Sequence, residues 1–74
     1  MEKENSVPAQ SELVQRLRQA AAQGDSEAQF NLGRVYDNGE GVAKDLAEAV
    51  KWYRLASEQG LAEAQSALAE IEMK

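Results

Sequence analysis

The chain is 74 residues long, and its net charge of −5 predicts neither nucleic acid nor an anionic membrane as a partner. It contains no histidine and no cysteine, which excludes disulfides, imidazole bases and most zinc sites. Of its 32 apolar residues 13 are alanine, so only 19 larger side chains can build the core of a single domain.

The N-terminal part of the sequence predicts a tail followed by a helix. Residues 1–10 are polar and include the single proline, Pro8, so we expect a disordered tail and then one domain of residues 11–74. Ser11 is the expected N-cap of the first helix, and Gly24 is expected to end it. The helical period places these apolar residues on one face: Leu13, Val14, Leu17, Ala20 and Ala21.

A second helix is expected directly after Gly24. Asp25 and Ser26 are equally good N-caps, because Ser26 would form a capping box with Gln29, so the first residue of this helix stays open. The turn residues from Asp37 to Gly39 are expected to end it. Its expected buried face carries Ala28, Leu32, Val35 and Tyr36.

Residues 38–44, which include two glycines, are expected to form a loop before a third helix. Asp45 is its expected N-cap with Glu48 at the capping-box position, and Gly60 is expected to end it. We expect its apolar face to carry Leu46, Ala49, Val50, Tyr53 and Ala56, with Trp52 beside them.

The fourth helix is expected from about Ala62 to Met73, after Leu61, which is a poor N-cap. Its expected buried residues are Ala64, Leu68 and Ile71. No segment of the chain alternates with period two, and β-branched residues are few, so we expect no strand. The sequence therefore predicts an all-α fold.

The sequence repeats itself with a period of 36 residues. Six residues recur at this spacing: Gln23, Gly24, Glu27, Ala28, Gln29 and Leu32 match Gln59, Gly60, Glu63, Ala64, Gln65 and Leu68. We therefore expect about two copies of a two-helix unit. A glycine inside a helix costs about 1 kcal/mol relative to alanine, so we expect Tyr53 or Trp52 to pack on the backbone of Gly33.

These residues resemble the Sel1-like repeat, a relative of the tetratricopeptide repeat. The motif is carried by Ala28-Gln-x-x-Leu32-Gly33-x-x-Tyr36, by Gly39-x-Gly41-Val42-x-x-Asp45, and by Ala49-x-x-Trp52-Tyr53-x-x-Ala56-x-x-x-Gly60-x-x-x-Ala64-Gln65. The resemblance covers residues 12–73 and implies a short α/α solenoid of about two 36-residue helical-hairpin repeats, with four helices. It also implies that the first helix of each repeat lines a concave face, and many members of the family are bacterial.

The resemblance implies a small non-enzymatic adaptor that binds a protein or peptide on its concave face. The residues expected on this face are Glu27, Phe30, Asn31, Arg34, Asp37, Asn38, Glu63, Ser66, Ala67 and Glu70. Phe30 is either an exposed anchor for the partner or a residue that packs on the first helix, and both interpretations stay open. Asn31 and Arg34 could equally be solvated helix residues, whereas Tyr36 and Trp52 are expected in the core.

A second hypothesis is structural. Repeat arrays usually hold about three or more units, so the side of the fourth helix that carries Leu68 and Ile71 is expected to lack cover. Packing of this helix on another copy would give a homodimer.

Other chemistry finds little support in the sequence. Asp37 and Glu48 have the spacing of the outer ligands of an EF-hand, but Gly39, Gly41 and Val42 stand where such a loop needs ligands and its glycine. Gly39 and Gly41 with Lys44 do not form a phosphate loop either. We therefore expect no metal, no cofactor and no enzymatic activity. The sequence shows no apolar leader and no membrane-spanning run, so a cytoplasmic location is expected.

Overall fold

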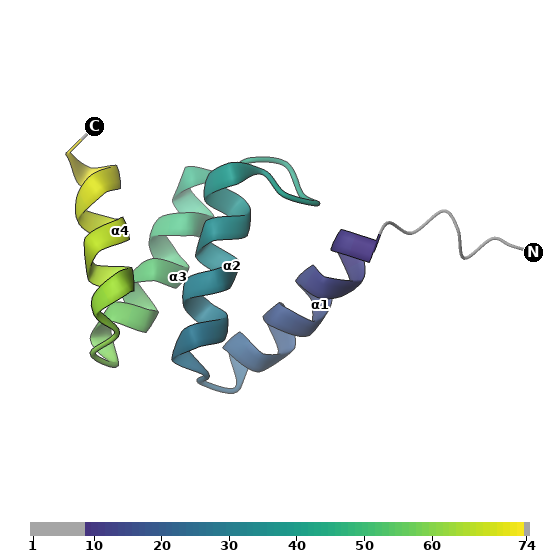
Figure 1. Ribbon diagram of the computed structural model, residues 1–74, viewed down its shortest axis with the longest axis horizontal. Helices are drawn as coiled ribbons and strands as arrows, with labels where there is room; N and C mark the ends of the chain where they lie inside the picture. The colour runs from purple at the N-terminus through teal and green to yellow at the C-terminus, as the bar shows by residue number, and fades with distance from the viewer. Residues whose placement is uncertain (1–8, 74) are drawn as a thin grey trace, which may run out of the picture.

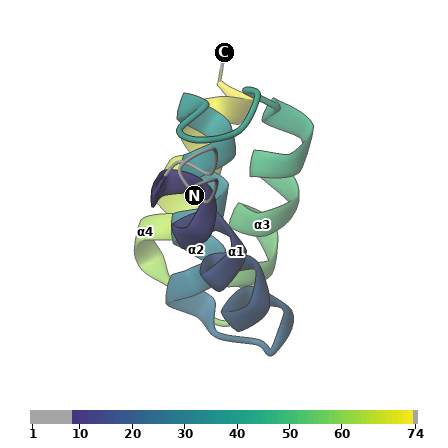
Figure 2. The ribbon, with the colours of Figure 1, turned by 90° about the vertical axis from the view of Figure 1, so that its right-hand side faces the viewer.

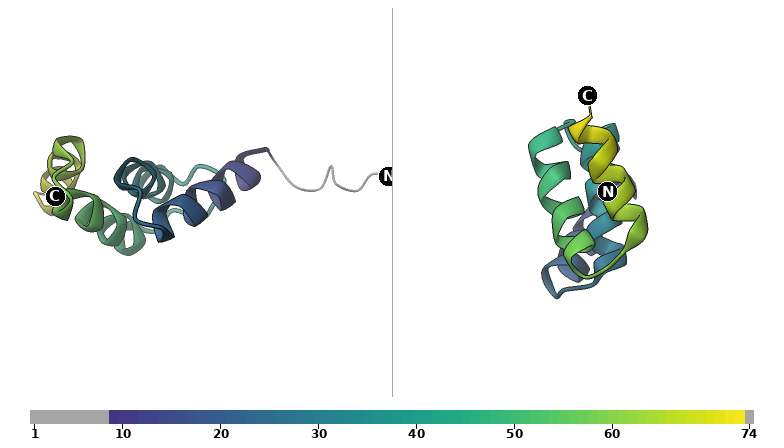
Figure 3. Two further views of the ribbon diagram at one scale, coloured as in Figure 1. Left: turned by 90° about the horizontal axis from the view of Figure 1, so that it is seen from below. Right: turned by 90° about the vertical axis from the view of Figure 1, so that its left-hand side faces the viewer.

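The computed structural model describes the backbone of residues 9–73 and the side chains of residues 12–73. Four helices follow one another in this part of the chain: α1 (Ala9–Ala22), α2 (Ser26–Asn38), α3 (Leu46–Glu58) and α4 (Ala62–Glu72) (Figure 1). Residues 9–73 contain no strand, which confirms the all-α prediction. In the view from below, α2 and α4 lie in one layer and α1 and α3 in the other, as in a short α/α solenoid (Figure 3).

The first helix begins earlier than expected. Helix α1 starts at Ala9, so Ser11 lies inside its first turn and the prediction that Ser11 is the N-cap is wrong. Alanine and glutamine are good helix formers, which is why the helix extends back to Ala9. Of the tail expected for residues 1–10, the last two residues are therefore helical, and residues 1–8 lie outside the described part of the chain.

The structure resolves the open question of how α2 begins. Asp25 is the N-cap, and its Oδ1 accepts hydrogen bonds from the backbone N–H of Glu27 at 3.0 Å and of Ala28 at 3.2 Å. The helix includes Asn38, which was expected in the loop, and ends at Gly39. Gly39 has a φ of 73° and donates its N–H to the carbonyl of Val35 at 2.8 Å, the usual role of a glycine at a helix end.

Helix α3 is capped by Asp45, whose Oδ1 accepts the N–H of Glu48 at 3.2 Å. The other half of the expected capping box does not form. The Asp45 N–H donates to the Tyr36 carbonyl at 3.0 Å, and Glu48 Oε1 accepts the indole N–H of Trp52 at 3.2 Å. Both groups of the expected pair thus have other partners.

The contact between Gly33 and Tyr53 holds α2 against α3. A Cβ on Gly33 would lie 2.6 Å from Cδ1 of Tyr53, so only glycine lets the ring approach this closely. Tyr53 is 1% exposed, whereas Trp52 packs on the core from its edge. The expected aromatic cover of Gly33 is therefore confirmed, with Tyr53 as the ring.

Helix α2 is the centre of the molecule. Figure 2 shows it behind α1, with α3 on one side and α4 on the other. The expected buried face of α2 is confirmed, and Leu32 is 0% exposed. Leu13 and Leu46 were expected on the apolar faces of their helices, but they are 55% and 42% exposed. Both lie near the beginning of their helices, where no other described helix covers them.

The side of α4 that is exposed to solvent differs from the one that was expected. Leu68 and Ile71, expected to lack cover, are partly buried and pack against the core. Gln65, Ala69 and Glu72 are among the exposed residues of this helix. Leu61 makes no side-chain cap hydrogen bond, as expected.

Candidate functional site

The expected concave residues gather in part around one hollow between α2 and the beginning of α4. It has a volume of about 190 Å³ and is lined by Glu27, Phe30, Asn31, Leu61 and Glu63. Four of these five were expected on the concave face, and Leu61 was not. The signal that could have found it is its place next to the Gln59-Gly60 pair, which brings α4 back towards α2.

The remaining expected residues lie elsewhere on these two helices. Arg34, Ser66 and Glu70 are exposed on the helix surfaces. Asn38 donates its amide to Glu40 at 3.2 Å and does not line the hollow. Ala67 is partly buried and packs against the core, and Asp37 is partly buried beside Tyr53.

Phe30 is partly buried, so it is neither a fully exposed anchor nor a fully buried residue. Its ring lies beside that of Tyr53 on α3, with a centroid distance of 5.7 Å and an interplanar angle of 41°. The guanidinium of Arg34 lies 5.9 Å from the Phe30 centroid. One part of Phe30 thus holds the helices together, and the rest lines the hollow.

The hydroxyl of Tyr53 joins α3 to the end of α2. It donates a hydrogen bond to Asp37 Oδ2 at 3.3 Å. Burial and the neighbouring Asp37 carboxylate raise the pKa of Tyr53 well above its ordinary value, so the hydroxyl remains a donor at physiological pH. This hydrogen bond helps to place Asp37 on α2.

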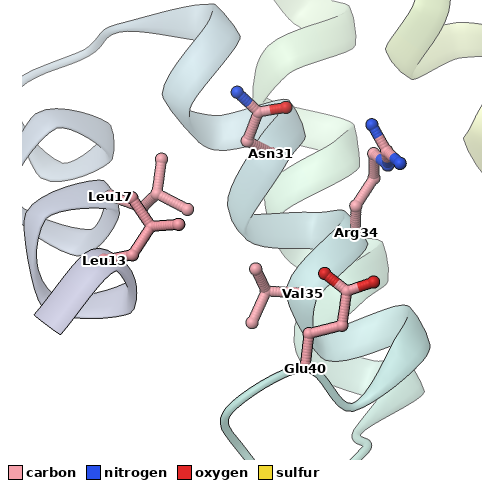
Figure 4. A pocket seen from close by; sticks show the side chains of 6 residues that line it. All are labelled: Leu13, Leu17, Asn31, Arg34, Val35 and Glu40. Atoms are coloured by element: carbon pink, nitrogen blue, oxygen red, sulfur yellow. The ribbon is translucent and has the colours of Figure 1, made fainter. Parts of the chain in front are cut away.

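A second hollow lies between α1 and α2. It has a volume of about 230 Å³, and Figure 4 shows Leu13 and Leu17 projecting into it from α1, with Val35 opposite them on α2. Asn31, Arg34 and Glu40 complete its lining. This hollow was missed from the sequence, because the helical period places Leu13 and Leu17 on one apolar face with the buried Val14 and does not tell them apart.

No arrangement for metal chemistry is found in the described residues. No group of three or more carboxylates, histidines or cysteines there could hold a metal ion. Asp37 and Glu48 have the EF-hand spacing, but each accepts a hydrogen bond from a side chain: Asp37 from the hydroxyl of Tyr53 and Glu48 from the indole of Trp52. Within residues 9–73 no helix is long and apolar enough to cross a membrane.

The chain is similar to known repeat proteins. The family model of the Sel1 repeat matches residues 26–61. This chain is 45% identical to "DAP3-binding cell death enhancer 1" of Rattus norvegicus over 49 residues, which are 66% of this chain and 10% of that protein. Over 52 residues, 69% of the chain, it is 52% identical to "Secretory immunoglobulin A-binding protein EsiB" of Escherichia coli, and it covers 11% of that protein. The chain thus spans about a tenth of the length of these relatives.

The fold has a solved counterpart. The crystal structure of a Sel1 repeat protein from Oxalobacter formigenes superposes with a TM-score of 0.81 at 44% sequence identity. The match covers 82% of this chain and 25% of that one. With the 36-residue period, the Gly33–Tyr53 contact and the two-layer helix arrangement, these similarities show that the chain belongs to the Sel1-like repeat proteins.

Proposed function

We propose that the chain is a non-enzymatic interaction module that binds a protein or peptide segment at the hollow between α2 and α4. Sel1 repeats generally mediate protein–protein interaction, and two of the relatives are named for binding proteins. The observation that carries the proposal is the hollow itself, whose lining combines the Phe30 side chain with the carboxylates of Glu27 and Glu63. An aromatic ring surrounded by charged groups is typical of a binding hot spot.

The charge of this face indicates the chemistry of the partner. The ten residues expected on it include four carboxylates, Glu27, Asp37, Glu63 and Glu70, and one guanidinium, that of Arg34. Such a face attracts a basic segment and repels an acidic one. The segment that fits best carries a lysine or arginine beside an apolar side chain, which would pack on Phe30 and Leu61.

The proposal is tested with short synthetic peptides that differ in basic and apolar content, with affinity measured by fluorescence anisotropy. Basic peptides with an apolar residue should bind more tightly than acidic peptides of equal length. Reversing one carboxylate of the hollow, by Glu27→Lys or Glu63→Lys, should weaken binding about tenfold, the effect of about 1.4 kcal/mol.

Glu58→Lys is the matched control, because this exposed residue lies at the end of α3 and does not line the hollow. It makes the same change in net charge and should leave affinity nearly unchanged. Equal weakening by Glu58→Lys would mean that net charge, rather than the hollow, attracts the peptide. No preference for basic peptides would contradict the proposal.

A second candidate function is self-association through α4. The observation that favours it is the exposed surface that α4 presents at Gln65, Ala69 and Glu72. The corresponding residues of α2 are buried: Gln29, Gly33 and Tyr36. The mass of the chain in solution, measured by light scattering over a range of concentrations, tests this function separately from peptide binding.

A further inference from the structure

The pair α1–α2 packs in the same way as the pair α3–α4. Gln29 Nε2 donates to the carbonyl of Ala21 at 3.0 Å, and 36 residues later Gln65 Nε2 donates to the carbonyl of Ser57 at 3.4 Å. A second set of equivalent contacts is Arg18 with Tyr36 and Arg54 with Glu72. The two pairs are therefore equivalent in geometry as well as in sequence.

Among the helices of residues 9–73, a third helix packs on one of these pairs and not on the other. Helix α2 packs on α3, where it covers Ala49 and Tyr53, which are 0% and 1% exposed. Thirty-six residues earlier, the equivalents on α1 are Leu13 and Leu17. These two leucines line the open 230 Å³ hollow. The hollow between α1 and α2 is therefore equivalent to the place on α3 and α4 where α2 packs. None of the described helices fills it.

Helix α4 has the sequence of a helix that fits this site. It is the 36-residue equivalent of α2, and its exposed Gln65, Ala69 and Glu72 correspond to the side of α2 that faces α3. The sizes match as well. Where α2 presents Gly33 to the large ring of Tyr53, α4 would present the larger Ala69 to the smaller Leu17.

Charge favours the same pairing. Helix α4 carries three glutamates and no basic residue, whereas α1 carries two arginines and, in Glu12, one acid. The hollow also contains Arg34. In the repeat register Glu70 of α4 corresponds to Arg34 of α2, so a docked α4 would bring an acidic residue, where α2 carries a basic one, to the hollow that contains Arg34.

We infer that the hollow between α1 and α2 binds α4 of a second copy of this chain, so that the copies join head to tail and the solenoid continues from one to the next. This inference specifies the second candidate function and does not depend on peptide binding. The interface joins two different surfaces, so each copy keeps one free surface of each kind, and assembly proceeds to a chain or a closed ring.

Two variants, each of which disables one surface, test the inference. Leu13→Glu places a charge in the hollow, and Ala69→Arg places a bulky cation on the docking side of α4. Both positions are exposed, so both variants should fold, which circular dichroism checks. At about 1 mM, where even weak interfaces are populated, light scattering should show wild-type mass rising with concentration and each variant alone near 8.1 kDa.

The decisive sample is an equal mixture of the two variants. Leu13→Glu retains an intact α4 and Ala69→Arg an intact hollow, so they should form a 1:1 complex of about twice the single-chain mass that grows no further. Leu55→Glu, an exposed leucine on α3 away from both surfaces, is the matched control and should associate like the wild type.

Three results would overturn the inference, and they are distinguishable. A monomeric wild type at all concentrations would refute self-association as a whole. Wild-type association that both variants retain would leave self-association standing and refute this interface. A mixture that stays monomeric while the wild type associates would refute the head-to-tail contact, because each variant supplies the surface that the other lacks.

Discussion

Helices α2 and α4 occupy equivalent places in the repeat, yet they differ in how much of each is covered. Leu32 is 0% exposed and Gln29 is 5% exposed on α2, whereas their equivalents Leu68 and Gln65 are partly buried and exposed on α4. The reason is that α2 is packed by both α1 and α3, while the extensive contacts of α4 within residues 9–73 are with α3. Equal sequence positions therefore contribute unequally to stability.

The residues that differ between the two helices follow this difference in cover. The Gly33 and Tyr36 positions of α2 hold alanine and glutamate on α4, and Phe30 is replaced by serine. Glycine is required only where a ring packs on the backbone, and a large apolar residue is useful only where a neighbour buries it. The comparison teaches that glycine and large aromatic residues occupy the motif positions of α2, which two helices cover, and not those of α4.

The largest contrast is expected from truncating the equivalent leucines. Leu32→Ala should lower the free energy of unfolding by about 3 kcal/mol, because it leaves a cavity between three helices. Leu68→Ala should cost about half of that, since Leu68 is already partly exposed. Urea denaturation of both variants measures the ratio, and equal losses would contradict the unequal cover of α2 and α4.

A smaller difference in stability is expected from opposite changes at Gly33 and Ala69, where a methyl group is added at one position and removed at the other. Gly33→Ala adds a methyl group that the Tyr53 ring must move to admit, and we expect a loss of about 1 to 2 kcal/mol despite the better helix propensity. Ala69→Gly removes a methyl group from an exposed helix position and should cost about 1 kcal/mol. Thermal unfolding of the two variants checks this, and a more stable Gly33→Ala protein would show that the ring does not pin the backbone.

The glutamine pair should show a contrast of about 1 kcal/mol. Gln29 is 5% exposed, donates to the Ala21 carbonyl and accepts from Gln59 Nε2 at 3.0 Å. Gln29→Ala removes both of these hydrogen bonds at a buried position and should cost about 1 to 2 kcal/mol. Gln65→Ala breaks an exposed contact of 3.4 Å and should change stability by less than about 0.5 kcal/mol. A comparable loss for both variants, by chemical denaturation, would argue against a special role of the buried amide.

The smallest effect on stability at neutral pH is expected from the hydroxyl of Tyr53, the residue of α3 on which α2 packs. Because burial and Asp37 raise the pKa of Tyr53, the folded chain holds this proton more tightly than the unfolded chain, whose tyrosine titrates near pH 10. The resulting stability is complete below about pH 10 and is lost as the pH rises above it.

Tyr53→Phe should therefore make the decline in stability above about pH 10 shallower than in the wild type, and it should cost about 1 kcal/mol or less at pH 7. Asp37→Asn should flatten the decline only in part, because burial remains. The free energy of unfolding measured from pH 8 to 11 checks both, and identical slopes for wild type and Tyr53→Phe would contradict the assignment.

Much of the fold could be predicted from the sequence because it depends on local signals. The repeat register, the cap at Asp45 and the presence of an aromatic ring over Gly33 follow from residue types at fixed spacings, whereas the choice between Asp25 and Ser26 as a cap did not. What could not be predicted is which helical faces are covered. Leu13 has the correct helical phase for the core, but phase alone does not tell whether another helix is present to bury it.

The candidate site was predictable to the same degree. The resemblance to the Sel1-like repeat placed Glu27, Phe30, Asn31 and Glu63 on one face, and the structure brings these four together. The contact of Phe30 with Tyr53 was missed, because it depends on the angle between α2 and α3 rather than on spacing along either helix. The open side of α4 was misassigned to Leu68 and Ile71 for the same reason.

Hydrogen exchange of the backbone amides tests most directly that α2 is held on two sides and α4 on one. At low protein concentration, the amides of Leu32–Tyr36 should exchange only through global unfolding, and those of Leu68–Glu72 should exchange at least about tenfold faster through local opening of α4. Equal protection of these two segments in the dilute chain would contradict the account.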